Sequence, residues 1–226
     1  MAPHNIWLEC ALWVPLGKAA ACRFQYGHHM EVQGKARPDR ARLWAAPPGG
    51  EPVELALVED GDTLSAKFFP AVRGVYALLA EYDPGVWSVT VDGRYLPGPA
   101  EEQAGEEVVR TIRYGHFAKR LVFVEQDTPW PGSFGREMEI VPLPPAGTEQ
   151  EILVQYRGRP LGGAKVHAIG RGRPGGRYGI TDPDGKLEFG LPAGEWLLFA
   201  RHESPGTDAD GADLRVTGVV LALTRS

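Results

Sequence analysis

Residues 151–170 read EILVQYRGRPLGGAKVHAIG, and this stretch decides the fold class. Residues 151–156 and 164–169 are two apolar runs of strand length, separated by the turn Gly158-Arg-Pro-Leu-Gly-Gly163. Glycine and proline supply the positive or fixed φ angles that a tight reversal requires. The pattern continues through the turns Thr181-Asp-Pro-Asp-Gly-Lys186 and Pro192-Ala-Gly194 to further strands at 187–191 and 196–201. The C-terminal part of the chain is therefore predicted to be a β-sandwich.

The rest of the chain shows short apolar runs with a period of two, separated by turn residues. Strands are predicted at residues 21–26, 53–58, 66–69, 74–82, 86–91, 120–125 and 138–141. Pro84-Gly85 predicts that residues 75–91 form a hairpin. Residues 142–148 contain three prolines, which cannot donate ladder hydrogen bonds, so this stretch predicts a domain boundary. We expect an all-β protein with two β-sandwich domains of the immunoglobulin/transthyretin-like kind, at residues 1–143 and 144–226.

The composition excludes several classes of protein. The chain has 226 residues, of which 43% are hydrophobic and 23% are charged, which is typical of a folded globular protein. Its 29 glycines and 20 prolines indicate a turn-rich protein without long helices. The net charge of −5 and the lack of a Lys/Arg run argue against nucleic acid as a partner. No apolar run approaches the 18 or so residues of a membrane helix, and the N-terminus lacks the features of a secretory leader.

Neither a nucleophile elbow, a phosphate-binding glycine loop nor an HExxH motif is present, so we expect no enzymatic activity. Four of the six histidines stand at predicted strand ends, and neutral imidazole is a good ligand for Ni, Co, Zn and Cu. Surface or capping histidines would show the same distribution. His28 and His29 can bind one ion together only if Gly27 breaks the strand, because successive strand residues point to opposite faces.

Cys10 and Cys22 are the two cysteines of the chain. Their spacing fits opposing strands of a hairpin that turns through Pro15-Leu16-Gly17-Lys18. The residues alone leave two interpretations open, a disulfide or two small core side chains.

Three motifs resemble a known family. His4-Asn-Ile-Trp-Leu, Phe24-Gln-Tyr-Gly-His-His29 and Tyr114-Gly-His-Phe-Ala-Lys119 look like the periplasmic component of cobalt/nickel ABC import systems. The C-terminal pattern at 158–202 is similar to the second domain of that family, which is itself like transthyretin and carboxypeptidase-regulatory modules. In that family the mature chain begins close to the first histidine, so Met1-Ala-Pro looks like a replaced leader.

The resemblance implies periplasmic binding of Ni(II) or Co(II) and delivery of the ion to a membrane importer. We assign the metal ligands to His4, His28, His29 and His116, with His202 as an outside candidate and His167 as a residue outside the site. Affinity should then fall below about pH 6, because imidazole must be deprotonated to bind. The oxidising compartment implies a Cys10–Cys22 disulfide, with thiolate ligation of a metal as the alternative. From other classes, the alternatives are a carbohydrate- or peptide-binding module without metal and an enzyme-associated accessory domain.

Overall fold

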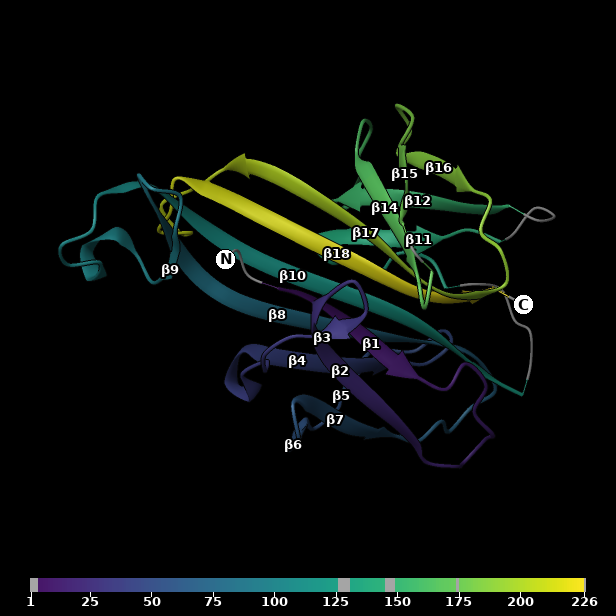
Figure 1. Cartoon of the computed structure of the whole chain (residues 1–226). Helices are drawn as coiled ribbons and strands as arrows, with labels where there is room; N and C mark the ends of the chain where they lie inside the picture. Colours follow the sequence, from purple (N-terminus) through teal and green to yellow (C-terminus); the bar gives the residue numbers. More distant parts are fainter. Residues whose placement is uncertain (1–3, 126–130, 145–148, 174, 226) are drawn as a thin grey trace.

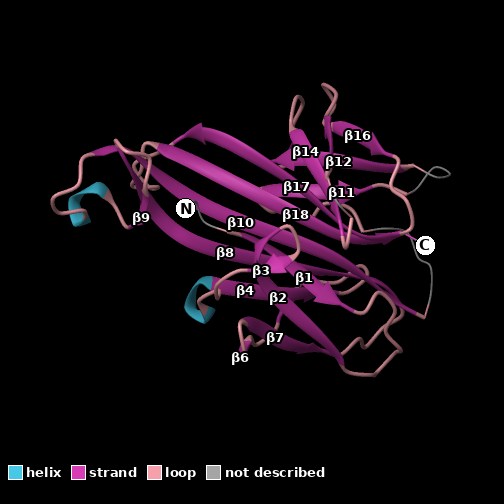
Figure 2. Ribbon diagram, viewed as in Figure 1, coloured by secondary structure: helices cyan, strands magenta, loops and turns pink. Residues whose placement is uncertain are grey.

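The computed structural model describes residues 4–125, 131–144, 149–173 and 175–225 (Figure 1). Met1-Ala-Pro and residues 145–148 of the predicted boundary lie outside these residues. Nearly all regular structure is β, and the two helices are short 3-10 turns at Pro38–Arg40 and Ala100–Glu102 (Figure 2). The structure confirms the all-β, β-sandwich class. No helix in the described ranges is long and apolar enough to cross a membrane.

A nine-stranded central sheet runs through the molecule (Figure 1). Its two longest strands, β8 and β10, have 17 residues each and pair in antiparallel fashion. The order across the sheet is β15-β14-β17-β18-β10-β8-β4-β5, with β9 also pairing with β8. The strand bounds are β4 Ala41–Ala46, β5 Val53–Glu54, β8 Gly74–Thr90, β9 Tyr95–Pro97, β10 Val108–Val124, β14 Lys165–Gly170, β15 Arg177–Ile180, β17 Gly194–Pro205 and β18 Leu214–Arg225.

Two smaller sheets complete the fold. A five-stranded sheet has the order β1-β2-β7-β6, with β3 pairing with β2, and a four-stranded sheet has the order β11-β12-β13, with β16 pairing with β12. Their strands are β1 Asn5–Cys10, β2 Ala20–His28, β3 Glu31–Val32, β6 Val58–Asp60, β7 Thr63–Phe68, β11 Met138–Pro142, β12 Gln150–Tyr156, β13 Arg159–Pro160 and β16 Lys186–Phe189.

The alternation of side chains along β18 shows that these two sheets cover opposite faces of the central sheet. Val220 and Ala222 belong to the core that includes β1, β2 and β7, whereas Val219, Leu221 and Leu223 belong to the core that includes β11 and β12. Because successive strand residues point to opposite faces, the central sheet takes part in both cores. In Figure 1 the smaller sheets accordingly lie on either side of the long strands.

The central sheet contains strands from both predicted domains. β18 pairs in parallel with β10 over residues 112–120 of β10, and β11, which precedes residue 143, pairs with β12, which follows it. The division into domains at residues 1–143 and 144–226 stays a prediction.

The predicted hairpin at Pro84-Gly85 is wrong, because β8 continues through both residues. β4 pairs with β8 only as far as Tyr82, so the missing N–H of Pro84 deprives no β4 residue of a hydrogen bond. On the other side, the register with β10 shifts between Tyr114 and His116, opposite residues 82–85. The turn residues therefore produce a bulge within a long strand rather than a reversal.

Candidate metal-binding histidine cluster

His4 and His28 are brought together by the pairing of β1 with β2. His4 immediately precedes β1, and the register that places Asn5 opposite Gly27 puts the His4 ring beside His28. The two imidazoles are stacked with ring centroids 4.5 Å apart, and the Tyr26 ring lies 4.9 Å from that of His4. The Nδ1 atom of His4 is buried and has no hydrogen-bond partner among the described residues. A neutral imidazole nitrogen in this state can accept a metal ion.

His116 approaches the same cluster from β10, just after the bulge. The residue is 6% exposed, and its Nε2 atom is buried without a hydrogen-bond partner in the part of the chain that the structure describes. The ring packs on the backbone of β18, since a β-carbon built at Gly218 would lie 3.0 Å from Nδ1 of His116. A side chain at this position would require the His116 ring to shift. His116 is also close enough to His28 for the charge of one imidazole to affect the other.

Burial keeps these three imidazoles neutral. Burial, and to a lesser extent the charge of His28, lowers the pKa of His116 to about 4. Burial also lowers the pKa of His4, with a further contribution from His28, and it lowers the pKa of His28, with a contribution from His29. A metal ion at neutral pH would therefore displace almost no protons. Loss of affinity by protonation is expected at a lower pH than for unperturbed imidazole.

Two tyrosines link the His4–His28 pair to His116. Tyr26 lies with its ring centroid 5.2 Å from that of Tyr82, and Tyr82 is the register partner of His116 across β8 and β10. Burial raises the pKa of Tyr26, so its hydroxyl stays protonated. These rings connect the two parts of the cluster, and Tyr82 and His116 together line a cavity of about 370 Å³.

His29 is exposed and lies in the turn between β2 and β3, where its φ of 53° takes it out of the strand. Its ring centroid is 6.4 Å from that of His28. It also lines a cavity of about 620 Å³ together with Glu31 and His167. The structure thus places His29 beside the cluster but facing a different space from His116.

His202 and His167 lie away from the cluster. Ala200 of β17 belongs to the core that includes β11 and β12, and His202, two residues later, lies against Tyr156 with the ring centroids 4.3 Å apart and the rings tilted by 46°. His202 is therefore on the opposite face of the central sheet from His116, and the outside candidate is not brought to the site. His167 is exposed on the side of β14 away from the core, as predicted.

The described residues contain no group of three His, Cys, Asp or Glu side chains that is already arranged to hold one metal ion. The two orphaned imidazole nitrogens nevertheless fit the requirements of a transition metal, because they are neutral, buried and unpartnered. Closure around an ion requires the rings to turn toward a common point.

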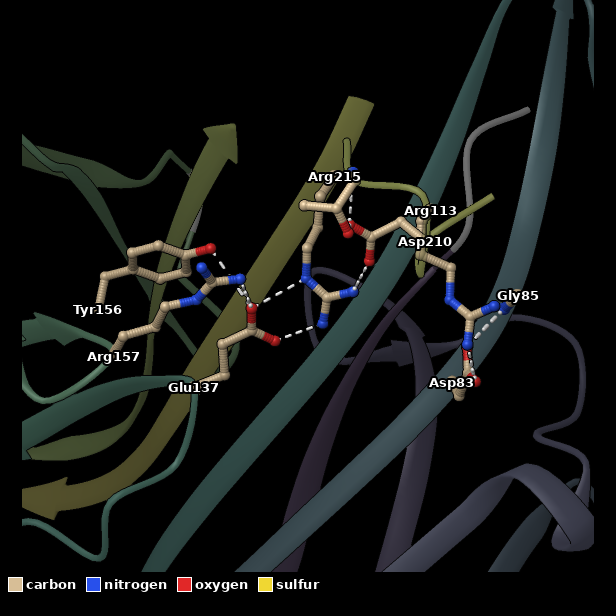
Figure 3. A network of polar contacts seen from close by, with 9 residues as sticks. Asp83, Gly85, Arg113, Glu137, Tyr156, Arg157, Asp210 and Arg215 are labelled. Carbon is tan, nitrogen blue, oxygen red and sulfur yellow. Dashed lines mark hydrogen bonds and ion pairs between the residues drawn. The ribbon is translucent and has the colours of Figure 1, made fainter. Parts of the chain in front are cut away.

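A network of polar contacts surrounds Glu137 at the start of β11 (Figure 3). The sequence did not predict this network. Glu137 accepts hydrogen bonds from Nε of Arg215 at 2.9 Å and from the hydroxyl of Tyr156 at 3.3 Å, and Arg215 also pairs with Asp210 at 2.7 Å. Burial alone would raise the pKa of Glu137, but the hydrogen bond and charge of Arg215 lower it. These carboxylates are neutralised by arginine and act as a structural brace.

A buried ion pair joins β10 to β11. Nζ of Lys119 contacts the carboxylate of Glu139, and the two side chains are 2% and 3% exposed. Glu139 also accepts hydrogen bonds from Oγ of Ser133 at 2.6 Å and from the backbone N–H of Phe134 at 2.9 Å. Burial lowers the pKa of Lys119 despite the opposing effect of Glu139. The additional donors compensate in part for the desolvation of the carboxylate.

A comparison with family profiles finds one match, described as "Domain of unknown function (DUF4198)", over residues 1–204. The chain belongs to the DUF4198 family. No curated protein matches this DUF4198 chain in sequence.

Several solved structures are distantly similar to the DUF4198 chain. Alpha-2-macroglobulin from Salmonella is 10% identical with a TM-score of 0.32, and the alignment covers 97% of this chain but 15% of that protein. A two-domain fibronectin type-III segment of chicken tenascin is 13% identical over 99% and 100% of the two chains, with a TM-score of 0.29. A cytokine receptor complex is 11% identical over 96% and 95%, with a TM-score of 0.26. Similarities at these TM-scores carry no argument about function.

In this DUF4198 protein, the residues that sequence reasoning missed are those that surround the imidazoles. Tyr82 lies in an alternating strand like many others, and Gly218 lies in an apolar run near the C-terminus. Gly218 carries one signal, because an isolated glycine in a strand often marks a close approach by another group. The partner it would contact could not be named without the parallel pairing of β10 with β18.

Proposed function

We propose that this protein binds a divalent transition metal ion, Ni(II) or Co(II), in the periplasm and passes it to a membrane importer without chemical turnover. The observation that carries the proposal is the pair of buried, unpartnered nitrogens on His4 and His116. A buried polar atom without a partner costs free energy and therefore calls for an explanation, and coordination of a metal would give both nitrogens a partner. The resemblance to periplasmic components of cobalt/nickel import systems supports the choice of metal and partner.

His4, His28 and His116 are the ligands in this proposal. His29 is the neighbour that can complete the coordination, because it is exposed and one residue from His28. Imidazole ligands suit Ni(II) and Co(II), and the intrinsic order of affinities places Cu(II) above both and Zn(II) above Co(II). Selectivity for the transported ion therefore depends on geometry and on metal supply rather than on raw affinity.

Isothermal titration of the metal-free protein with Ni(II), Co(II), Zn(II) and Cu(II) tests this function. We expect saturable binding of one ion, and replacement of His28 or His116 by Ala should weaken it by about tenfold or more, equivalent to about 1.4 kcal/mol. His202→Ala is the matched control, since this histidine lies on the other face of the central sheet. His167→Ala is a less suitable control because His167 shares a cavity with His29.

The proposal fails if the wild-type protein shows no saturable binding. It also fails in its site assignment if His4, His28 and His116 can be replaced together by Ala without changing the titration. Absence of any metal binding would favour the carbohydrate- or peptide-binding module as the alternative.

A further inference from the structure

The two cysteines face each other but differ in access. Cys10 at the end of β1 is the register partner of Cys22 in β2, and the connecting turn closes with a hydrogen bond from the N–H of Lys18 to the carbonyl of Pro15 at 3.1 Å. Both thiols are free in the structure. Cys22 is completely buried, whereas Cys10 is half-buried and lines a cavity of about 370 Å³. A small reagent in this cavity would therefore meet Cys10 first.

The cavity also contains a buried cation without a carboxylate partner. Arg120 is 5% exposed, and its guanidinium donates hydrogen bonds to the carbonyl of Cys10 at 2.9 Å and to Oγ1 of Thr224 at 3.4 Å. The acidic residues of the same cavity, Glu9 and Glu195, both pair with Arg171 instead. Within the described residues, Arg120 makes no direct ion pair, and the charges of Glu195 and Glu9 act on it only across the cavity. Burial still lowers the pKa of Arg120, because desolvation of a buried charge is costly.

A thiolate at Cys10 would place a negative charge next to the Arg120 guanidinium, which already contacts the Cys10 backbone. The hydrogen bond with Cys22, and then the charge of Arg120, lowers the pKa of Cys10 against the effect of burial. The same hydrogen bond and burial raise the pKa of Cys22, which stays a thiol and donates to Cys10. Thiolates are the reactive form of cysteine and are favoured beside cations in partly accessible sites. The two sulfurs are thus different in chemistry as well as in access.

We propose that Cys10 is a nucleophilic modification site that reacts through this cavity with small disulfides, and that Cys22 resolves the adduct. The Cys10 thiolate attacks one sulfur of a disulfide R–S–S–R, a new S–S bond forms, and R–S⁻ leaves. The Cys22 sulfur then attacks the Cys10 sulfur, the second R–S⁻ leaves, and it takes the proton of Cys22. The protein dithiol loses two electrons, and the small disulfide is reduced to two thiols.

This inference is independent of metal binding and goes beyond the disulfide that the sequence predicts. The spacing of the two cysteines indicates that they can pair, but it does not say which sulfur is attacked first. The structure adds an order of attack and assigns Arg120 the role of stabilising the attacking thiolate. Arg120 is a positioning residue in this scheme, since it touches the backbone of Cys10 and acts on its thiol by charge.

Oxidised glutathione and intact-mass spectrometry test the proposal on the reduced, full-length protein. The wild type should lose two hydrogens by forming the Cys10–Cys22 disulfide. Cys22→Ser should gain one glutathionyl group on Cys10. Cys10→Ser should react at Cys22 at no more than about one tenth of that rate, because the Cys22 sulfur is buried and protonated. Equal rates for the two variants, or faster reaction of Cys10→Ser, would overturn the order of attack.

Arg120 is tested in the Cys22→Ser background. Arg120→Gln should slow the formation of the mixed disulfide, whereas Arg120→Lys, which keeps the charge, should slow it less. Because Arg120→Gln removes a buried side chain and could fail to fold, the pH dependence of iodoacetamide alkylation in Cys22→Ser alone provides a second measurement. The midpoint should lie below the value of about 8.5 for a free cysteine, and a midpoint at or above that value would refute the role of the cation.

Discussion

His116 makes the stability of the metal-free protein sensitive to mild acid. Burial lowers the pKa of its imidazole in the folded state to about 4, whereas the unfolded chain has the ordinary value of 6.5. Between these two values the unfolded state binds more protons than the folded state, so the free energy of unfolding decreases as the pH falls. From the two pKa values we expect His116 to account for a loss of about 2 kcal/mol between pH 7 and pH 5, approaching about 3 kcal/mol below pH 4.

Urea unfolding in the presence of a chelator at pH 7, 6 and 5 measures this loss. His116→Gln removes the titrating group while keeping a polar side chain of similar size. Between pH 7 and pH 5, the free energy of unfolding of this variant should therefore fall by about 2 kcal/mol less than that of the wild type. His4 and His28 contribute in the same direction, but they are common to both proteins and cancel in the difference. Val122→Ala, a buried change in the same strand, should lower stability equally at each pH. Equal losses in the wild type and in His116→Gln would refute the reasoning.

Three further predictions concern the parts of the fold that support the site. Glu139→Ala should cost about 3–5 kcal/mol in urea unfolding, because it leaves the charge of Lys119 buried and unpaired. Gly27→Ala should shift His28 and the turn that contains His29, because the new β-carbon would collide with the carbonyl oxygen of Glu31. The melting temperature should fall, and the free energy of unfolding should decrease by about 1–3 kcal/mol. Glu137, whose pKa is lowered in the folded state, stabilises the protein above its unfolded value of 4.5, so Glu137→Gln should flatten the loss of stability as the pH falls through the folded value.

Each of these changes has a control. Replacing Lys119 by Met and Glu139 by Leu together should cost far less than Glu139→Ala, and an equal cost would contradict the explanation by an unpaired charge. Gly132→Ala should leave the melting temperature unchanged, because a β-carbon there meets no atom within 4 Å. An identical acid response of Glu137→Gln and the wild type would show that the contacts of Glu137 do not stabilise its charged form.

The sequence predicted β2, β11, β12 and β14 closely, but it did not predict β4, β18 or the first part of β10, and the strand predicted at residues 53–58 is two short strands, β5 and β6. The rings of His4 and His28, which the sequence assigned to one site, are stacked in the structure, and His116 is close enough to His28 to affect its charge. A metal site made of these residues stays a prediction. The pairing of Cys10 with Cys22 followed from the spacing across a turn. In each case the relation is local or rests on a motif, which is the kind of information that a single sequence holds.

The errors arise where distant strands decide the outcome. Pro84-Gly85 is a strong local turn signal, but the neighbouring β10 holds β8 in one extended strand and absorbs the irregularity as a bulge. The separation of His202 from His116 depends on which face of the central sheet each occupies. That face is set by the pairing of β17, β18 and β10, segments that lie far apart in the chain.

The packing of His116 on Gly218 has a consequence for biosynthesis. His116 is made about a hundred residues before the backbone that covers its ring, and β18 is the last strand of the described chain. Contacts between such distant segments form late and slowly during folding. During translation, a growing chain that already contains all the proposed imidazole ligands would still lack the backbone on which the His116 ring packs. The proposed site would therefore mature only after β18 has left the ribosome.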